Sequence, residues 1–101
     1  MGRTQVEVPK EKIEAFCRKR HIRKLSLFGS VLRKDFGPDS DVDVLVEFEK
    51  GHVPGFIGLY EMEEEFSEIL GGRKIDLLTE KFLNRRMRAH VLAEAEVEYV
   101  R

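Results

Sequence analysis

The sequence predicts a small α/β fold, a single domain over residues 1–101 in which helices pack on a short β-sheet in the order αβαβαβα. Three observations support this prediction. Apolar residues recur at helical spacing in some segments, and they alternate or run continuously in shorter ones. Turns rich in glycine, aspartate or proline separate the two kinds of segment. Residues 1–8 are expected to form a frayed lead-in.

The first predicted element is a helix over residues 9–20. Pro9 suits the first turn of a helix, where a missing backbone N–H does no harm. Apolar side chains then follow at helical spacing, at Ile13, Phe16 and Cys17. Because Cys17 is the only cysteine, an internal disulfide is excluded, and its apolar neighbours indicate a buried structural thiol.

A strand over residues 23–28 follows and stops at Gly29. The glycine is expected to open a turn into a brief helix, which runs from Ser30 to about Lys34. Residues 35–40 have the composition of a loop throughout.

The rest of the chain is expected to alternate between strands and helices. Valines alternate over residues 41–48, which predicts a strand with one buried face. Apolar residues at helical spacing over residues 56–70 predict a helix, which ends at a pair of glycines. A third strand over residues 73–79 and a last helix over residues 84–96 complete the predicted order. The final stretch, 97–100, fits either a terminal strand or an extended tail.

The composition argues against several classes of function. Charged residues make up 37% of the chain, yet the net charge is only -1, so no overall field favours nucleic acid or an anionic membrane. We therefore expect no direct nucleic-acid binding. The sequence contains no run of 18 apolar residues and no signal-peptide pattern, which predicts a cytoplasmic protein.

Asp41 and Asp43 are the first candidate site residues. Two residues apart on a strand, they leave the same face, about 6.5–7 Å apart at the backbone. Like charges this close raise each other's pKa, and a divalent cation would relieve their repulsion. Asp76 interrupts an otherwise apolar strand, where a carboxylate is uncommon without a partner. If the strands are neighbours, the three carboxylates can hold two Mg²⁺ ions.

Gly29 and Ser30 form the complementary half of the predicted site. A glycine between a strand and a helix lets backbone N–H groups approach an anion closely. The Ser30 hydroxyl and the Arg33 guanidinium can then contact phosphate oxygens. Each feature alone has a plainer explanation, as an ordinary turn, a solvated strand start or an edge-strand residue. Their combination favours a phosphoryl-transfer site.

Other polar residues give no comparable signal. His21, His52 and His90 are scattered and match no metal-ligand spacing, so solvated or capping roles are expected. The glutamates at 63–65 are expected to form a solvated helix face, with partner docking as the lesser alternative.

Three segments together resemble a known family. They are LFGSVLR at residues 27–33, SDVDVLV at residues 40–46 and KIDL at residues 74–77. This combination resembles the minimal nucleotidyltransferases (MNT) of the DNA polymerase beta-like superfamily, over residues 10–98. The resemblance implies a mixed β-sheet flanked by helices. It also implies that Asp41 and Asp43 bind two Mg²⁺ ions and that Asp76 completes the catalytic metal site.

The resemblance further implies a nucleotide site and a partner. Gly29, Ser30 and Arg33 would hold the triphosphate of ATP or another nucleoside triphosphate. Family members often carry glycine after the arginine, where this chain has Lys34. Proteins of this group commonly pair with a HEPN-domain RNase toxin and act as antitoxins by attaching AMP to a toxin tyrosine.

Two alternative functions remain open at the level of sequence. One is a non-catalytic module that neutralises a toxin by binding it, and the other is nucleotidyl transfer to a small molecule or an RNA end. Phe56 and Tyr60 are equally compatible with the core and with the edge of a substrate cleft or a partner interface.

Overall fold

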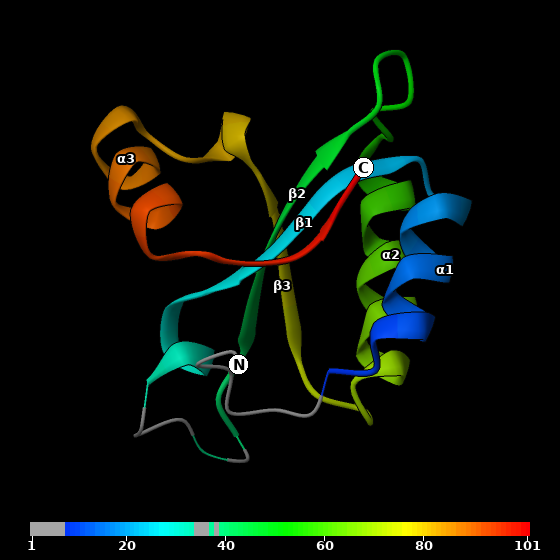
Figure 1. Cartoon of the computed structure of the whole chain (residues 1–101), viewed down its shortest axis with the longest axis horizontal. Coiled ribbons are helices and arrows are strands. Elements are labelled where there is room, and N and C mark those ends of the chain that lie inside the picture. The colour runs from blue at the N-terminus through cyan, green and yellow to red at the C-terminus, as the bar shows by residue number, and fades with distance from the viewer. Residues whose placement is uncertain (1–7, 34–36, 38) are drawn as a thin grey trace.

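A computed structural model describes residues 8–33, 37 and 39–101 of the chain. Its centre is a four-stranded sheet with the strand order β3-β2-β1-β4 (Figure 1). Strand β1 pairs antiparallel with β2 and with β4, whereas β2 and β3 run parallel, so the sheet is mixed as the family resemblance implied. The four strands are β1 (Ile22–Phe28), β2 (Val42–Phe48), β3 (Ile75–Thr79) and β4 (Glu96–Val100).

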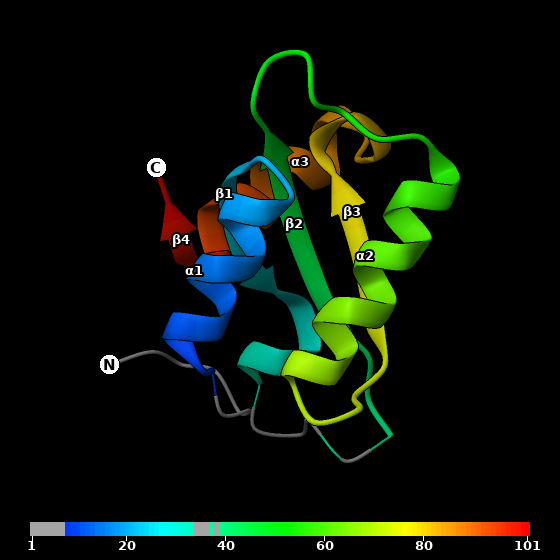
Figure 2. The same ribbon diagram turned by 90° about the vertical axis from the view of Figure 1, so that its right-hand side faces the viewer.

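Helices cover both faces of this sheet. Helices α1 and α2 lie on one face and α3 lies on the other (Figures 1 and 2). Among the described residues, no helix is long and apolar enough to cross a membrane. The three helices are α1 (Lys10–Lys19), α2 (Phe56–Ile69) and α3 (Arg85–Glu94).

The alternating valines of β2 bury one side of the strand. Val42, Val44 and Val46 all lie in the core beneath α1 and α2. Leu45 points to the opposite face and packs in a second apolar cluster, together with Val91 of α3. Because side chains alternate along a strand, Asp41 and Asp43 are placed on the same side as Leu45.

The predicted element order was wrong between β1 and β2. A 3₁₀ helix, η1 (Gly29–Leu32), occupies this position in place of an α-helix. The Arg33 N–H donates to the Ser30 carbonyl over 2.9 Å, and Arg33 itself is already extended (φ -107°, ψ 155°). The backbone therefore leaves the helical region after a single turn. Lys34, the predicted end of this helix, lies outside the described residues.

The predicted order was also wrong at the C-terminal end, where the chain does not finish on a helix. Strand β4 follows α3 and pairs with β1, so the terminal-strand interpretation of residues 97–100 is confirmed. A second short 3₁₀ helix, η2 (Glu80–Phe82), precedes α3. The observed order is αβηβαβηαβ. Without β4, the backbone groups along one edge of β1 would have no strand partner.

Two side-chain predictions have clear outcomes. Cys17 is fully buried, and burial, with a smaller contribution from Glu14, raises the pKa of its thiol to about 12, which confirms a structural role. Phe56 and Tyr60 are 80% and 60% exposed, so a core role for these two residues is wrong.

Candidate active site

Two of the predicted aspartates face each other across neighbouring strands. Asp43 on β2 and Asp76 on β3 are direct partners in the parallel register. Adjacent strands lie about 4.8 Å apart, and paired residues present their side chains on the same face of the sheet. Asp41 immediately precedes β2 and lies two residues from Asp43. The sheet thus brings together the carboxylates that the sequence analysis had grouped by chemistry.

Gly29 allows the chain to turn directly against Asp43. Phe28, the last residue of β1, pairs with Asp43, and Gly29 then adopts a left-handed backbone conformation with φ of 75°. A Cβ atom at Gly29 would lie 2.3 Å from the Asp43 Oδ2 atom. Glycine is therefore required here twice, for its backbone conformation and for the space that the carboxylate occupies.

Ser30 joins this turn to the aspartates. Its hydroxyl donates to the Asp41 carbonyl oxygen over 3.2 Å. Its backbone N–H donates to the Asp43 carboxylate, and this hydrogen bond lowers the pKa of Asp43. Ser30 therefore positions the start of β2, a role that its place in the sequence did not reveal.

Asp43 lies in an environment that disfavours its negative charge. Burial, followed by the negative charges of Asp76 and Asp41, raises the pKa of Asp43 above its ordinary value. The positive charge of Arg33 and the Ser30 N–H act in the opposite direction, and the net effect is still upward. A divalent cation would relieve the repulsion among the three carboxylates. Because oxygen-only donors are the ligands that Mg²⁺ prefers, the residues present fit this metal.

Arg33 is exposed and directly follows η1. Its effect on the pKa of Asp43 shows that its positive charge acts on the carboxylate cluster. Gly29, Ser30 and Arg33 therefore all act on Asp43, through close contact, a hydrogen bond and positive charge respectively. Lys34, the departure from the family pattern, falls outside the part of the chain that the structure describes.

Glu63 is a residue of this region whose role the sequence analysis missed. Its carboxylate, on α2, accepts the backbone N–H of Leu77 over 2.9 Å, one residue after Asp76. The interpretation of 63–65 as a solvated face was thus wrong for Glu63. It was also wrong for Glu65, which forms ion pairs with Lys19 and Arg20 at the C-terminal end of α1. No local pattern distinguishes these glutamates from their neighbours, because their partners are distant in sequence.

Backbone and side-chain contacts also hold the segment before β2. The Val42 N–H donates to the Lys74 carbonyl over 2.8 Å, which extends the β2–β3 pairing toward Asp41. The Arg73 guanidinium donates to the Gly37 carbonyl over 3.0 Å. The approaches to β2 and β3 are therefore tied to each other at the end of the sheet that carries the aspartates.

Comparisons with known proteins agree with this geometry. A family model described as nucleotidyltransferase domain matches residues 10–99. The protein adenylyltransferase MntA of Thermococcus cleftensis is 37% identical over 73 residues, which cover 72% of this chain and 71% of MntA. Two proteins of Methanocaldococcus jannaschii are also named as protein adenylyltransferases, in both cases provisionally. One is 33% identical over 85% of this chain and 89% of its own length; the other is 36% identical over 62% of each.

Solved structures show the same fold. A structure described provisionally as a minimal nucleotidyltransferase has a TM-score of 0.70, with 31% identity and 85% of each chain covered. A toxin–antitoxin structure with AMP-PNP superposes with a TM-score of 0.73 at 18% identity, over 92% of this chain and 74% of the other. The family model covers most of the chain and the relatives share its fold, and the chain therefore belongs to the nucleotidyltransferase domain family.

Proposed function

We propose that this protein transfers AMP from ATP, with two Mg²⁺ ions, to a tyrosine hydroxyl of a partner HEPN toxin and thereby acts as its antitoxin. The observation that carries the proposal is the register that pairs Asp43 with Asp76 while Gly29 leaves room for the Asp43 carboxylate. The similarity to MntA supports protein adenylylation. A structural relative from Shewanella oneidensis, an MNT antitoxin with a tri-AMPylated HEPN toxin (TM-score 0.61, 18% identity, 91% and 70% coverage), supports the acceptor.

The three aspartates have two roles in this proposal. Asp41 and Asp43 bind both metal ions, and Asp76 completes the catalytic metal site and helps to activate the acceptor hydroxyl. When bound, Mg²⁺ supplies positive charge that lowers the repulsion between the attacking oxygen and the α-phosphate and stabilises the departing pyrophosphate. A bond forms between the acceptor oxygen and the α-phosphorus, the bond to pyrophosphate breaks, and the hydroxyl proton passes by way of the Asp76 carboxylate to water.

The turn after β1 binds the triphosphate. Gly29 lets the chain turn directly against the Asp43 carboxylate, so phosphates held by this turn would lie next to the metal ligands. Ser30 contributes polar groups at the same turn, and the Arg33 guanidinium offers a planar pair of donors to phosphate. We place the nucleotide beside Asp43 for these reasons.

Labelled ATP tests the catalytic proposal. The protein is incubated with ATP labelled at the α-phosphate, Mg²⁺ and a HEPN-domain toxin from the same organism, and label on the toxin is measured. We expect transfer by the wild type and a loss of at least about 100-fold in Asp41→Ala and Asp43→Ala. Asp39→Ala is the matched control, because it removes an exposed aspartate just before the pair. Equal labelling by the wild type and both site variants would contradict the proposal.

A second candidate function is neutralisation of a toxin by binding alone. The observation that favours it is the exposure of three apolar side chains in the first part of α2: Phe56 is 80%, Ile57 78% and Tyr60 60% exposed. Exposed apolar side chains gathered in one place are typical of protein interaction sites. Under this alternative, an Asp41→Ala/Asp43→Ala double variant would still rescue cells from the toxin as well as the wild type. A Phe56→Ser/Tyr60→Ser variant would fail to do so.

A further inference from the structure

We propose that His21, Glu49 and His52 form a second metal site, selective for Zn²⁺ and similar transition-metal ions. One ligand atom from each residue lies within 4.8 Å of the others. The cluster is at the opposite end of the β1–β2 pair from Asp43, because Ile22 pairs with Phe48 at one end and Phe28 pairs with Asp43 at the other. The seven residues of β1 separate the two ends by about 20 Å.

Backbone hydrogen bonds bring the three residues together. His21 lies in the turn between α1 and β1, Glu49 directly follows β2, and His52 lies in the next turn. The Glu49 N–H donates to the His21 carbonyl over 2.8 Å, and the His52 N–H donates to the Glu49 carbonyl over 3.0 Å. The backbone positions from which the three side chains extend are therefore set by the fold before any ion binds.

The backbone of His21 adds an independent observation. His21 has φ of 57°, in the left-handed region. The other residues with positive φ in the described part of the chain are all glycines, which adopt this conformation without strain. A side chain at such a position costs about 1 kcal/mol. A left-handed residue directly after the C-cap is a common end of a helix, and here it turns the chain so that the imidazole lies beside Glu49.

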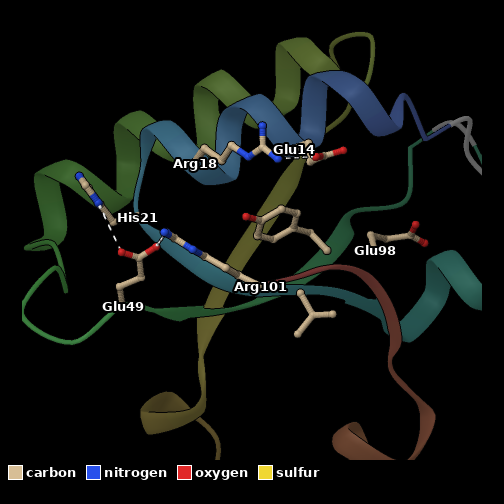
Figure 3. Close-up of a pocket in the computed structure, with 8 residues that line it drawn as sticks. Glu14, Arg18, His21, Glu49, Glu98 and Arg101 are labelled. Carbon is tan, nitrogen blue, oxygen red and sulfur yellow. Dashed lines mark hydrogen bonds and ion pairs between the residues drawn. The ribbon is translucent and has the colours of Figure 1, made fainter.

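The three side chains lie close to a tetrahedral arrangement, but their ligand atoms are farther apart than in a metal-bound site. The His21 and His52 rings stack with their centres 3.9 Å apart. The His21 Nδ1 atom lies 3.7 Å from the Glu49 Oε1 atom (Figure 3). Tetrahedral Zn²⁺ holds its ligands at about 2.0–2.2 Å from the metal, which places the ligand atoms about 3.3 Å from one another. The longest separation must therefore shorten by no more than about 1.5 Å. Rotation of two exposed rings can achieve this.

The donor set distinguishes this site from the aspartates. Two imidazoles and one carboxylate suit Zn²⁺, with a fourth position left for water. The aspartate cluster offers only oxygen, which suits Mg²⁺. The two sites are therefore expected to select different ions.

A purely structural ion pair accounts for only part of the cluster. The Glu49 Oε2 atom pairs with Arg101, just beyond β4, while its Oε1 atom faces His21 (Figure 3). This arrangement explains the position of the Glu49 carboxylate without explaining why two imidazoles stack beside it. Because Arg101 uses the other oxygen, Oε1 can bind a metal without breaking the Arg101 pair. A bound ion would then connect the turn after α1, the turn after β2 and the end of β4.

Zinc titration of the full chain tests the site. The protein is stripped with EDTA, and Zn²⁺ binding is measured by competition with a chromophoric chelator. We expect one ion per chain at this site, and an affinity about 10- to 100-fold weaker in Glu49→Gln and His52→Ala. His21→Asn is the third variant, because asparagine tolerates the left-handed backbone. His90→Ala is the matched control, since His90 is an exposed histidine 3.4 Å from Glu94.

A second measurement separates the site from nonspecific binding and from loss of folding. In wild-type NMR spectra, Zn²⁺ should shift the ring signals of His21 and His52 at one equivalent and leave those of His90 unchanged. Adenylyl transfer with Mg²⁺ should persist in His52→Ala, so the outcome is independent of the proposed function. The proposal is overturned if folded site variants bind Zn²⁺ as tightly as the wild type, or if His90→Ala weakens binding equally.

Discussion

At the residue scale, the contact between Gly29 and Asp43 connects the nucleotide-binding turn to the metal ligands. The carboxylate occupies the space that a side chain at Gly29 would need. Neither residue can change without affecting the other, and the glycine is as much a part of the site as the aspartate.

Gly29→Ala should therefore inactivate the protein while leaving it folded. The new methyl group would meet the Asp43 Oδ2 atom and displace the carboxylate, and a displacement of about 1 Å can reduce a rate about 100-fold. The left-handed backbone adds about 1–2 kcal/mol of destabilisation. Gly51→Ala is the control, because Gly51 has φ of 82° and open space around its Cα. Chemical denaturation and label transfer should show similar destabilisation in both variants and inactivation only in Gly29→Ala.

Asp43 also makes the metal-free protein sensitive to pH. Its pKa is raised in the folded state by burial and by Asp76 and Asp41. A raised pKa means that the contribution of Asp43 to stability is fully present below the ordinary aspartate pKa of about 3.9 and is lost as the pH rises through the raised value. At neutral pH, the ionised carboxylate therefore destabilises the metal-free fold.

Asp43→Asn should accordingly melt at a higher temperature than the wild type at pH 7 in EDTA. The difference should shrink at about pH 3, where Asp43 is protonated in both states. Excess Mg²⁺ should narrow the difference at pH 7 by stabilising the wild type. Thermal melts of the wild type, Asp43→Asn and the control Asp39→Asn measure this. A variant less stable than the wild type at pH 7 in EDTA would contradict the electrostatic explanation.

At the scale of elements, β3 is an edge strand that α2 holds in place. Glu63 of α2 accepts the N–H of Leu77, a backbone group that faces away from β2. Because Leu77 directly follows Asp76, this bond also limits the movement of the third carboxylate.

Glu63→Ala should destabilise the protein by about 1–3 kcal/mol, because it leaves the Leu77 N–H without its acceptor. It should also reduce label transfer, since Asp76 would lose part of its support. Glu63→Gln keeps a carbonyl acceptor and should restore most of both properties. Glu61→Ala, an exposed change on the same helix, should have little effect. If Glu63→Ala matches Glu61→Ala in urea denaturation, the bond does not hold β3.

At the scale of the whole molecule, the sheet has an apolar cluster on each face. The larger cluster, beneath α1 and α2, includes Phe66, whose ring lies 5.3 Å from that of Phe16. The smaller cluster, beneath α3, includes Leu45 and Val91. We propose that the two clusters form one domain, because β1 and β2 contribute side chains to both.

One domain should unfold in one transition. Phe66→Ala should lower the free energy of unfolding by about 3–5 kcal/mol and Leu45→Ala by about 2–5 kcal/mol. Far-UV circular dichroism and the fluorescence of Tyr60 and Tyr99 should report the same urea midpoint for each variant. Separate midpoints, with Leu45→Ala shifting only one, would show that the α3 face unfolds independently.

Much of the fold could be predicted from local patterns. The alternation of Val42, Val44 and Val46 identified β2 and its buried face, and this alternation also places Asp41 and Asp43 on the opposite face. Gly29 marked the end of β1 because glycine alone adopts such a turn easily. These features depend on residues within a few positions of one another, so the sequence by itself determined them.

Only the tertiary structure decided which distant segments meet. Strand register placed Asp43 opposite Asp76, and pairing with β1 showed that the last residues form a strand and not an extended tail. Glu63 was misjudged because its partner is on β3, and the contact between His21 and His52 could not be predicted because the two residues lie in different turns. Such contacts follow from the packing of helices and strands on a shared sheet, and no spacing within the chain encodes them locally.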